Sequence, residues 1–154
     1  MKSTLVAIIC FLGAHSAYAN CTPTYAMQDA RNELQKIEQS YQHGSVGKID
    51  VLMAKENVLN LSLSHCNSEW TSQDFSNFKD LATNLVAQLA LTTTRYNYGL
   101  GTEQALILAR AKVEGLAKVC PELEKYVTKQ FQSGVASAQD LATLKSACDL
   151  LPMP

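Results

Sequence analysis

The sequence predicts an all-α protein of about six helices, arranged as three consecutive αα-hairpins, two of which are closed by disulfides. Apolar residues recur at steps of three and four along the chain, as on helices with one buried face, and no segment alternates convincingly with period two. Two cysteine pairs are each centred on a glycine. Because a turn between helices brings together residues at equal distances from it, this spacing indicates a disulfide at the open end of two hairpins.

The first nineteen residues have the three parts of an export signal. A basic residue follows the initial methionine, residues 5–13 form an apolar run too short to span a bilayer as a helix, and Ala17-Tyr18-Ala19 is a typical cleavage site. Lipid attachment at Cys21 requires an aliphatic residue three positions before the cysteine, and that position is occupied by Tyr18. We therefore expect signal-peptide cleavage after Ala19 without lipid attachment. The form of this signal predicts export to a bacterial periplasm.

Residues 20–154 are expected to form a single α-helical domain of 135 residues (154 minus 19), which is long enough for a hydrophobic core. Removal of Lys2 leaves 12 basic residues (13 minus 1) against 14 acidic ones, a net charge of −2. This balance does not favour nucleic-acid binding, and no later stretch predicts stable membrane insertion. Cleavage also removes Cys10, and the four remaining cysteines meet an oxidising compartment. The oligomeric state stays open.

The first expected hairpin joins helices at about 23–43 and 48–65. A Thr-Pro pair before the first helix is typical of an N-cap followed by proline at the first helical position. Gly44 follows the end of the first helix, a position at which the backbone often adopts the left-handed conformation that glycine favours. Cys21 and Cys66 lie 23 and 22 residues from this glycine, which predicts the disulfide Cys21–Cys66.

The second expected hairpin joins helices at about 72–98 and 102–119. Gly99 ends the first of them in the same way. Thr71-x-x-Asp74 before this hairpin and Ser137-x-x-Asp140 in the third resemble capping boxes, with aspartate in place of the usual glutamate. This hairpin has no cysteine pair of its own.

The third expected hairpin joins helices at about 121–133 and 138–150. We expect Pro121 to end the preceding helix and to open this one. Gly134 occupies the turn, and Cys120 and Cys148 each lie 14 residues from it, which predicts the disulfide Cys120–Cys148.

The three turns share an aromatic residue and a glycine three positions later. A small or hydroxyl residue then caps the following helix, and an acidic residue faces its positive end. The pattern is carried by Tyr41-x-x-Gly44 with Asp50-Val51-Leu52-x-Ala54, by Arg95-Tyr96-Asn97-Tyr98-Gly99-Leu100 with Ala109-Arg110-Ala111, and more weakly by Phe131-x-x-Gly134. The first two turns resemble the helix–turn–helix at the periplasmic tip of TolC-type outer membrane efflux proteins. The resemblance implies hairpin tips that meet another envelope protein. It is confined to the turns, and we do not expect membership of the family as a whole.

Residue types that serve catalysis or metal binding do not form a recognisable set. The mature chain has two histidines, His43 in a turn and His65 beside a cysteine, and no three or four ligands have a zinc-binding spacing. No C-x-x-C, G-x-S-x-G or H-E-x-x-H motif and no phosphate-binding glycine loop occurs. We therefore predict no catalytic, cofactor or metal site, and a protein that is not an enzyme. An enzyme with an unrecognised site remains as an alternative interpretation.

These observations favour a non-enzymatic exported protein that binds another protein of the cell envelope, as an accessory to a secretion, conjugation or efflux apparatus. An inhibitor or immunity protein that blocks a toxin or hydrolase is the second interpretation. We expect the contact at the second turn, where Tyr98 and Leu100 lie on the hairpin without a cysteine pair. The alternative is that both side chains cap the core between neighbouring hairpins. The identity of the partner stays open.

Overall fold

The computed structural model describes residues 24–64 and 70–152, and all regular secondary structure in these two ranges is helical. The described helices are α2 (Thr24–Gln42), α3 (Lys48–Leu63), α4 (Ser72–Asn97), α5 (Glu103–Gln132) and α6 (Ala138–Asp149). The predicted all-α class is thereby confirmed. The signal sequence, Cys21, Cys66 and His65 lie outside the described residues.

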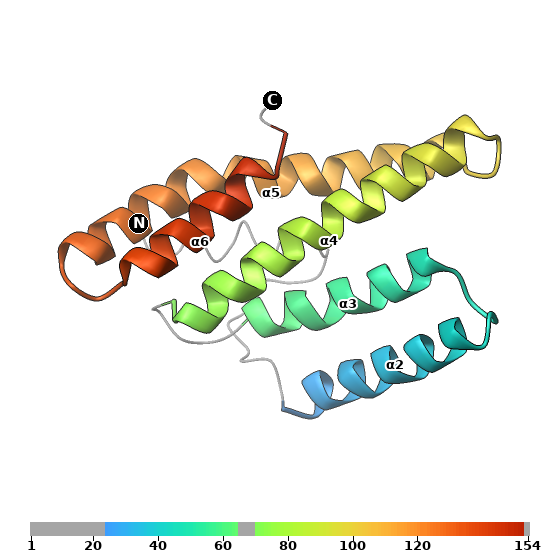
Figure 1. Ribbon diagram of the computed structural model, residues 1–154, viewed down its shortest axis with the longest axis horizontal. Coiled ribbons are helices and arrows are strands. Elements are labelled where there is room, and N and C mark those ends of the chain that lie inside the picture. Colours follow the sequence, from blue (N-terminus) through green and yellow to red (C-terminus); the bar gives the residue numbers. More distant parts are fainter. Residues whose placement is uncertain (1–23, 65–69, 153–154) are drawn as a thin grey trace.

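Helix α4 lies at the centre of the arrangement and packs against α3, α5 and α6, whereas α2 packs on α3 (Figure 1). Consecutive helices run in opposite directions, so the turns fall at the two ends of the molecule. The α2–α3 and α4–α5 turns lie at one end of the long axis, and the α5–α6 turn lies at the other (Figure 1). Since α6 is much shorter than α5, it lies only along the part of α5 that is near the α5–α6 turn. The α4–α5 turn therefore projects from the opposite end of the molecule.

The hydrophobic core lies between α4, α5 and α6. Its largest fully buried side chains are Phe75, Phe78, Leu81 and Leu85 of α4, Val113, Leu116, Val119, Leu123 and Val127 of α5, and Leu144 of α6. Trp70 covers one end of it, with ring centroids 5.4 Å from Phe75 and 5.9 Å from Phe78. Burial of each such aliphatic or aromatic side chain contributes about 1.5–3 kcal/mol, which makes these three helices the most firmly packed part.

One continuous helix, Glu103–Gln132, replaces the two helices expected at 102–119 and 121–133. Pro121 lies inside this helix. The prediction that Pro121 separates two helices was therefore wrong, and the described residues form five helices where six were expected. The described chain still forms three hairpins, but the second and third share α5.

Packing on both sides of Pro121 explains why the helix continues. Proline removes one backbone hydrogen bond, here to the carbonyl of Ala117, and costs about 3 kcal/mol inside a helix. Leu116, Val119 and Leu123 are each no more than 1% exposed, and each contributes about 1.5–3 kcal/mol by burial. If the helix ended at the proline, some of these buried side chains would lose their packing against α4. A continuous helix is therefore favoured.

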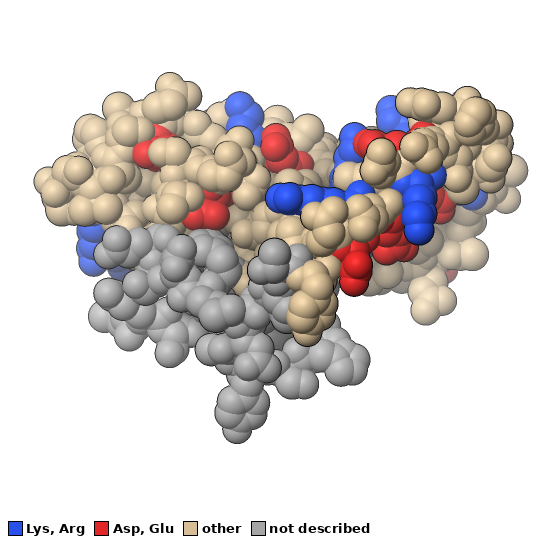
Figure 2. Space-filling view, turned by 90° about the horizontal axis from the view of Figure 1, so that it is seen from below, with Lys and Arg blue, Asp and Glu red and all other residues tan. Residues whose placement is uncertain are grey.

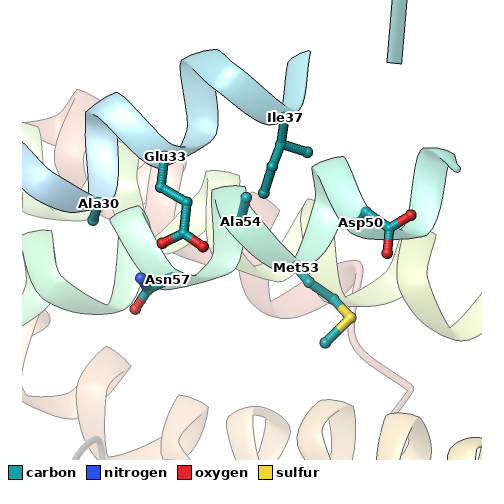
Figure 3. A pocket seen from close by; sticks show the side chains of 7 residues that line it. All are labelled: Ala30, Glu33, Ile37, Asp50, Met53, Ala54 and Asn57. Atoms are coloured by element: carbon teal, nitrogen blue, oxygen red, sulfur yellow. The ribbon is translucent and has the colours of Figure 1, made fainter. Parts of the chain in front are cut away.

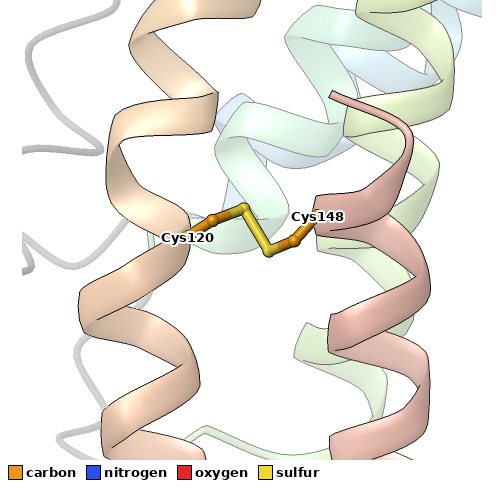
Figure 4. The surroundings of a disulfide bond; sticks show 2 residues. All are labelled: Cys120 and Cys148. Carbon is orange, nitrogen blue, oxygen red and sulfur yellow. A yellow bond between two sulfur atoms is a disulfide. The ribbon is translucent and has the colours of Figure 1, made fainter. Parts of the chain in front are cut away.

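The disulfide Cys120–Cys148 is confirmed. It joins the middle of α5 to the end of α6 with a Cα–Cα distance of 5.8 Å (Figure 4). It thereby closes the short hairpin at the end opposite to its turn, as the equal spacing about Gly134 predicts.

Candidate functional site

Each of the three turns is built on a glycine in the left-handed region, with φ of 73° at Gly44, 68° at Gly99 and 76° at Gly134. In the α4–α5 turn the amide of Gly99 donates to the carbonyl of Tyr96 at 2.9 Å, and that of Leu100 donates to the carbonyl of Arg95 at 2.8 Å. The other two turns have the same pair of bonds. This pattern satisfies the last carbonyls of the helix and holds the turn in one shape.

A second glycine makes the α4–α5 turn compact. A Cβ atom at Gly101 would lie 3.2 Å from the amide nitrogen of Tyr96 and 3.4 Å from the carbonyl carbon of Arg95. Thr102 is the N-cap of α5, and its hydroxyl accepts a hydrogen bond of 3.2 Å from the amide of Ala105. Hydrogen bonds and close packing therefore define the backbone on both sides of Leu100.

The four most exposed large apolar side chains near this turn form what we call the tip surface: Tyr98 (77% exposed), Leu100 (70%), Ile107 (59%) and Leu108 (59%). Tyr98 and Leu100 follow the end of α4, and the other two lie in the second turn of α5. Exposures of this size do not fit the alternative in which Tyr98 and Leu100 cap the core. The turn presents both side chains to the surroundings.

The sequence interpretation missed Ile107 and Leu108, although the sequence carries a signal for them. Leu106, Ile107 and Leu108 are consecutive apolar residues, and successive helical positions are rotated by about 100°. Three such residues cannot all face one neighbouring helix. Leu106 is 6% exposed and takes the inward position, so the other two point away from it.

The α5–α6 turn provides a natural comparison because its backbone has the same geometry. Val135 follows Gly134 as Leu100 follows Gly99, and it is 62% exposed. At the α2–α3 turn the corresponding residue is Ser45. An apolar residue is therefore not required at this position for the turn to form.

The structure also has two hollows beside the α2–α3 hairpin. One of about 250 Å³ lies between α2 and α3 and is lined by Ala30, Glu33, Ile37, Asp50, Met53, Ala54 and Asn57 (Figure 3). Its two carboxylates, Glu33 and Asp50, are well separated, with Ala54 between them (Figure 3). Asp50 already accepts a 2.8 Å hydrogen bond from the amide of Gly47 at the start of α3. These carboxylates are not arranged as a general acid–base pair.

A second hollow, of about 420 Å³, runs over α3 between α2 and α4. It is lined by Leu34, Leu52, Lys55, Val58, Leu59, Asp80, Thr83, Asn84 and Ala87. Most of these side chains are apolar or neutral. This hollow also does not gather titratable groups into a reactive set.

Charged side chains of both signs occur on the face of the molecule that Figure 2 shows. Figure 2 shows Lys and Arg side chains lying among Asp and Glu side chains, without a broad area of one sign on this face. Within 24–64 and 70–152, no three His, Cys, Asp or Glu side chains are grouped to hold a metal ion. The helices of these same two ranges are each too short or too polar to cross a membrane.

The predicted site residues are thus brought together in part. Tyr98, Leu100 and Gly99 share one projecting turn, while Gly44 lies in the other turn at the same end of the molecule (Figure 1). No family model, curated protein or solved structure matches this chain. The resemblance of its turns to TolC-type tips stays a prediction from their residues.

Proposed function

We propose that this protein is an exported, non-enzymatic binding protein that contacts another protein of the cell envelope through the tip surface. The observation that carries the proposal is the exposure of Tyr98 and Leu100, at 77% and 70%, on a projecting turn. Clustered exposed apolar side chains are a common mark of protein contact sites. Tyrosine is also enriched among the residues that contribute most to such interfaces.

The rigidity of the turn supports the same proposal. Its backbone is held by the bonds of Gly99 and Leu100 and by the close approach of Gly101 to α4. Binding therefore does not require this loop to be ordered first, and the conformational entropy lost on association is small. An exposed apolar residue on such a turn is well suited to enter a pocket of a partner.

The residues Arg95 to Leu100 and their resemblance to TolC-type tips point to the class of partner. On this basis the protein serves as an accessory to a secretion, conjugation or efflux apparatus in the periplasm. The proposal includes signal cleavage after Ala19, and a second disulfide, Cys21–Cys66, that closes the α2–α3 hairpin.

Site-specific cross-linking in exporting cells tests the proposal. A photoreactive amino acid placed at Leu100 is expected to give one discrete cross-linked product that contains a protein of an envelope apparatus. The same amino acid at Val135 is the matched control, because the two positions share turn geometry and exposure but lie at opposite ends of the molecule. Equal products from both positions would contradict contact through the tip surface.

The identity of the cross-linked protein distinguishes the interpretations. A component of envelope machinery supports the accessory role. A soluble hydrolase or toxin that loses activity when the purified proteins are mixed would show an inhibitor or immunity protein instead. Replacement of Tyr98 and Leu100 by serine should then abolish capture of the identified protein without lowering the melting temperature, since both side chains are exposed.

A further inference from the structure

A polar cluster joins three helices below the tip surface, and it consists of Glu56 of α3, Asn84 and Gln88 of α4, and Lys112 of α5. The side-chain nitrogen of Gln88 donates to Glu56 Oε2 and to Asn84 Oδ1, both at 2.8 Å. Lys112 Nζ donates to the same Glu56 Oε2 at 2.8 Å. One carboxylate oxygen therefore ties α4 and α5 to α3.

The cluster is largely withdrawn from solvent. Gln88 and Asn84 are 4% and 6% exposed, and the side chains of Lys112 and Glu56 are 20% and 13% exposed. A pair in such surroundings is weakly screened, and loss of one partner leaves a charge with poor solvation. The ion pair of Lys55 with Glu38 differs, because its side chains are 46% and 43% exposed at 3.3 Å.

The position of the cluster along the hairpin gives it a particular role. Of the side-chain hydrogen bonds between different helices in the described residues, those of this cluster lie nearest to the α4–α5 turn. Beyond it, residues 89–97 and 103–111 extend about 14 Å toward the turn at 1.5 Å per residue. The disulfide Cys120–Cys148 and α6 hold the opposite part of α5.

We propose that Glu56, Gln88 and Lys112 are positioning residues for the tip surface. By fixing the base of the projecting segment, they set the direction in which Tyr98 and Leu100 face a partner. The consequence for binding rests on the proposed function. The effect of these residues on the order of 89–97 and 103–111 does not rest on the proposed function, because it is measured on the protein without a partner.

Hydrogen exchange of the exported, disulfide-bonded protein tests this inference. In Lys112→Met, the amides of 89–97 and 103–111 are expected to exchange about tenfold faster, since exchange reports the free energy of local opening. The amides of α6 should keep their rates. Lys55→Met is the matched control, because it breaks an exposed ion pair between α3 and α2 and should leave both regions unchanged.

Two further variants separate positioning from general stabilisation. Lys112→Arg keeps the charge and should restore slow exchange, and Glu56→Gln should reproduce the faster exchange with little change in volume. The inference is overturned if hydrogen exchange in α6 accelerates as much as exchange near the turn. It is also overturned if exchange near the turn does not accelerate in Lys112→Met, or does not accelerate in Glu56→Gln.

The cross-link from Leu100 supplies a readout of function. Lys112→Met should lower its yield severalfold, and Lys112→Arg should restore it, while the protein remains folded. If exchange changes as expected but Leu100 gives no specific product even in the unaltered protein, the positioning of the turn stands and the proposed function fails. If Leu100 gives its product and exchange near the turn is unaffected, the proposed function stands and the inference is overturned.

Discussion

Asp140 fixes the start of α6 through hydrogen bonds with Ser137. The amide and hydroxyl of Ser137 donate to Asp140 Oδ2 at 2.9 and 2.7 Å, and the amide of Asp140 donates back to the Ser137 hydroxyl at 3.1 Å. The hydroxyl of Ser137 is the main cause that lowers the pKa of Asp140 below its usual 3.8; burial opposes this shift, and the Ser137 amide and the Ser72 hydroxyl add to it. The carboxylate also lies at the positive end of the helix.

This cap predicts a pH dependence of stability. Because the pKa of Asp140 is lower in the folded state, its carboxylate stabilises the fold above pH 3.8, and this contribution is lost as the pH falls through the folded-state value. Asp140→Asn should therefore lower the free energy of unfolding at pH 7 by about 1 kcal/mol. In denaturant titrations the difference from the unaltered protein should vanish in strong acid. Asp29→Asn, on an exposed part of α2, is the control, and a difference independent of pH would contradict the prediction.

Local residue chemistry was the part of the site that the sequence could predict. The glycines of the three turns and the cap at Ser137 and Asp140 depend on neighbours within a few positions, which the sequence displays directly. The pair formed by Glu56 and Lys112 spans 56 positions, and nothing in the neighbouring sequence distinguishes these two residues from the charged residues that lie on the surface. Such a pair becomes visible only when the helices are placed.

At the scale of elements, α5 shows where local rules gave the wrong boundary. Proline disfavours a helix interior, so Pro121 predicted a break. The structure instead continues the helix, because α4 and α6 pack against residues on both sides of the proline. Tertiary packing outweighed a local preference, and a single sequence displays the preference but not the packing.

Pro121→Ala provides a direct check on α5. Alanine restores the amide that can bond to the carbonyl of Ala117, and Pro121 itself is exposed, so little packing is lost. The variant should be stabilised, by up to about 3 kcal/mol, in reversible thermal or denaturant unfolding. If two helices met at this residue, proline would stand at a favourable first helical position. An unchanged or lowered stability would therefore favour that arrangement.

At the scale of the whole molecule, stability is unevenly distributed. The core lies in α4, α5 and α6, with Leu63 of α3 joining it at one end. Among the described residues of α2, by contrast, Ala30 alone is a buried apolar residue. Two hollows also lie beside the α2–α3 hairpin. Elements with few buried contacts open at lower free energy than the core. We therefore expect α2 to be the least protected of the described helices.

The disulfide predicted at Cys21–Cys66 would offset this weakness, and its effect can be measured. Peptide mapping of the exported protein without reduction should give an N-terminus at Asn20 and the links Cys21–Cys66 and Cys120–Cys148. Replacing Cys21 and Cys66 by serine should then accelerate hydrogen exchange in α2 and leave α4 to α6 unchanged, because α2 packs on α3 and not on the core. The corresponding change at Cys120 and Cys148 is the comparison, since it should weaken α5 and α6 instead. A link between Cys66 and Cys120, or equal acceleration in every helix, would show that the first hairpin is not a separately closed unit.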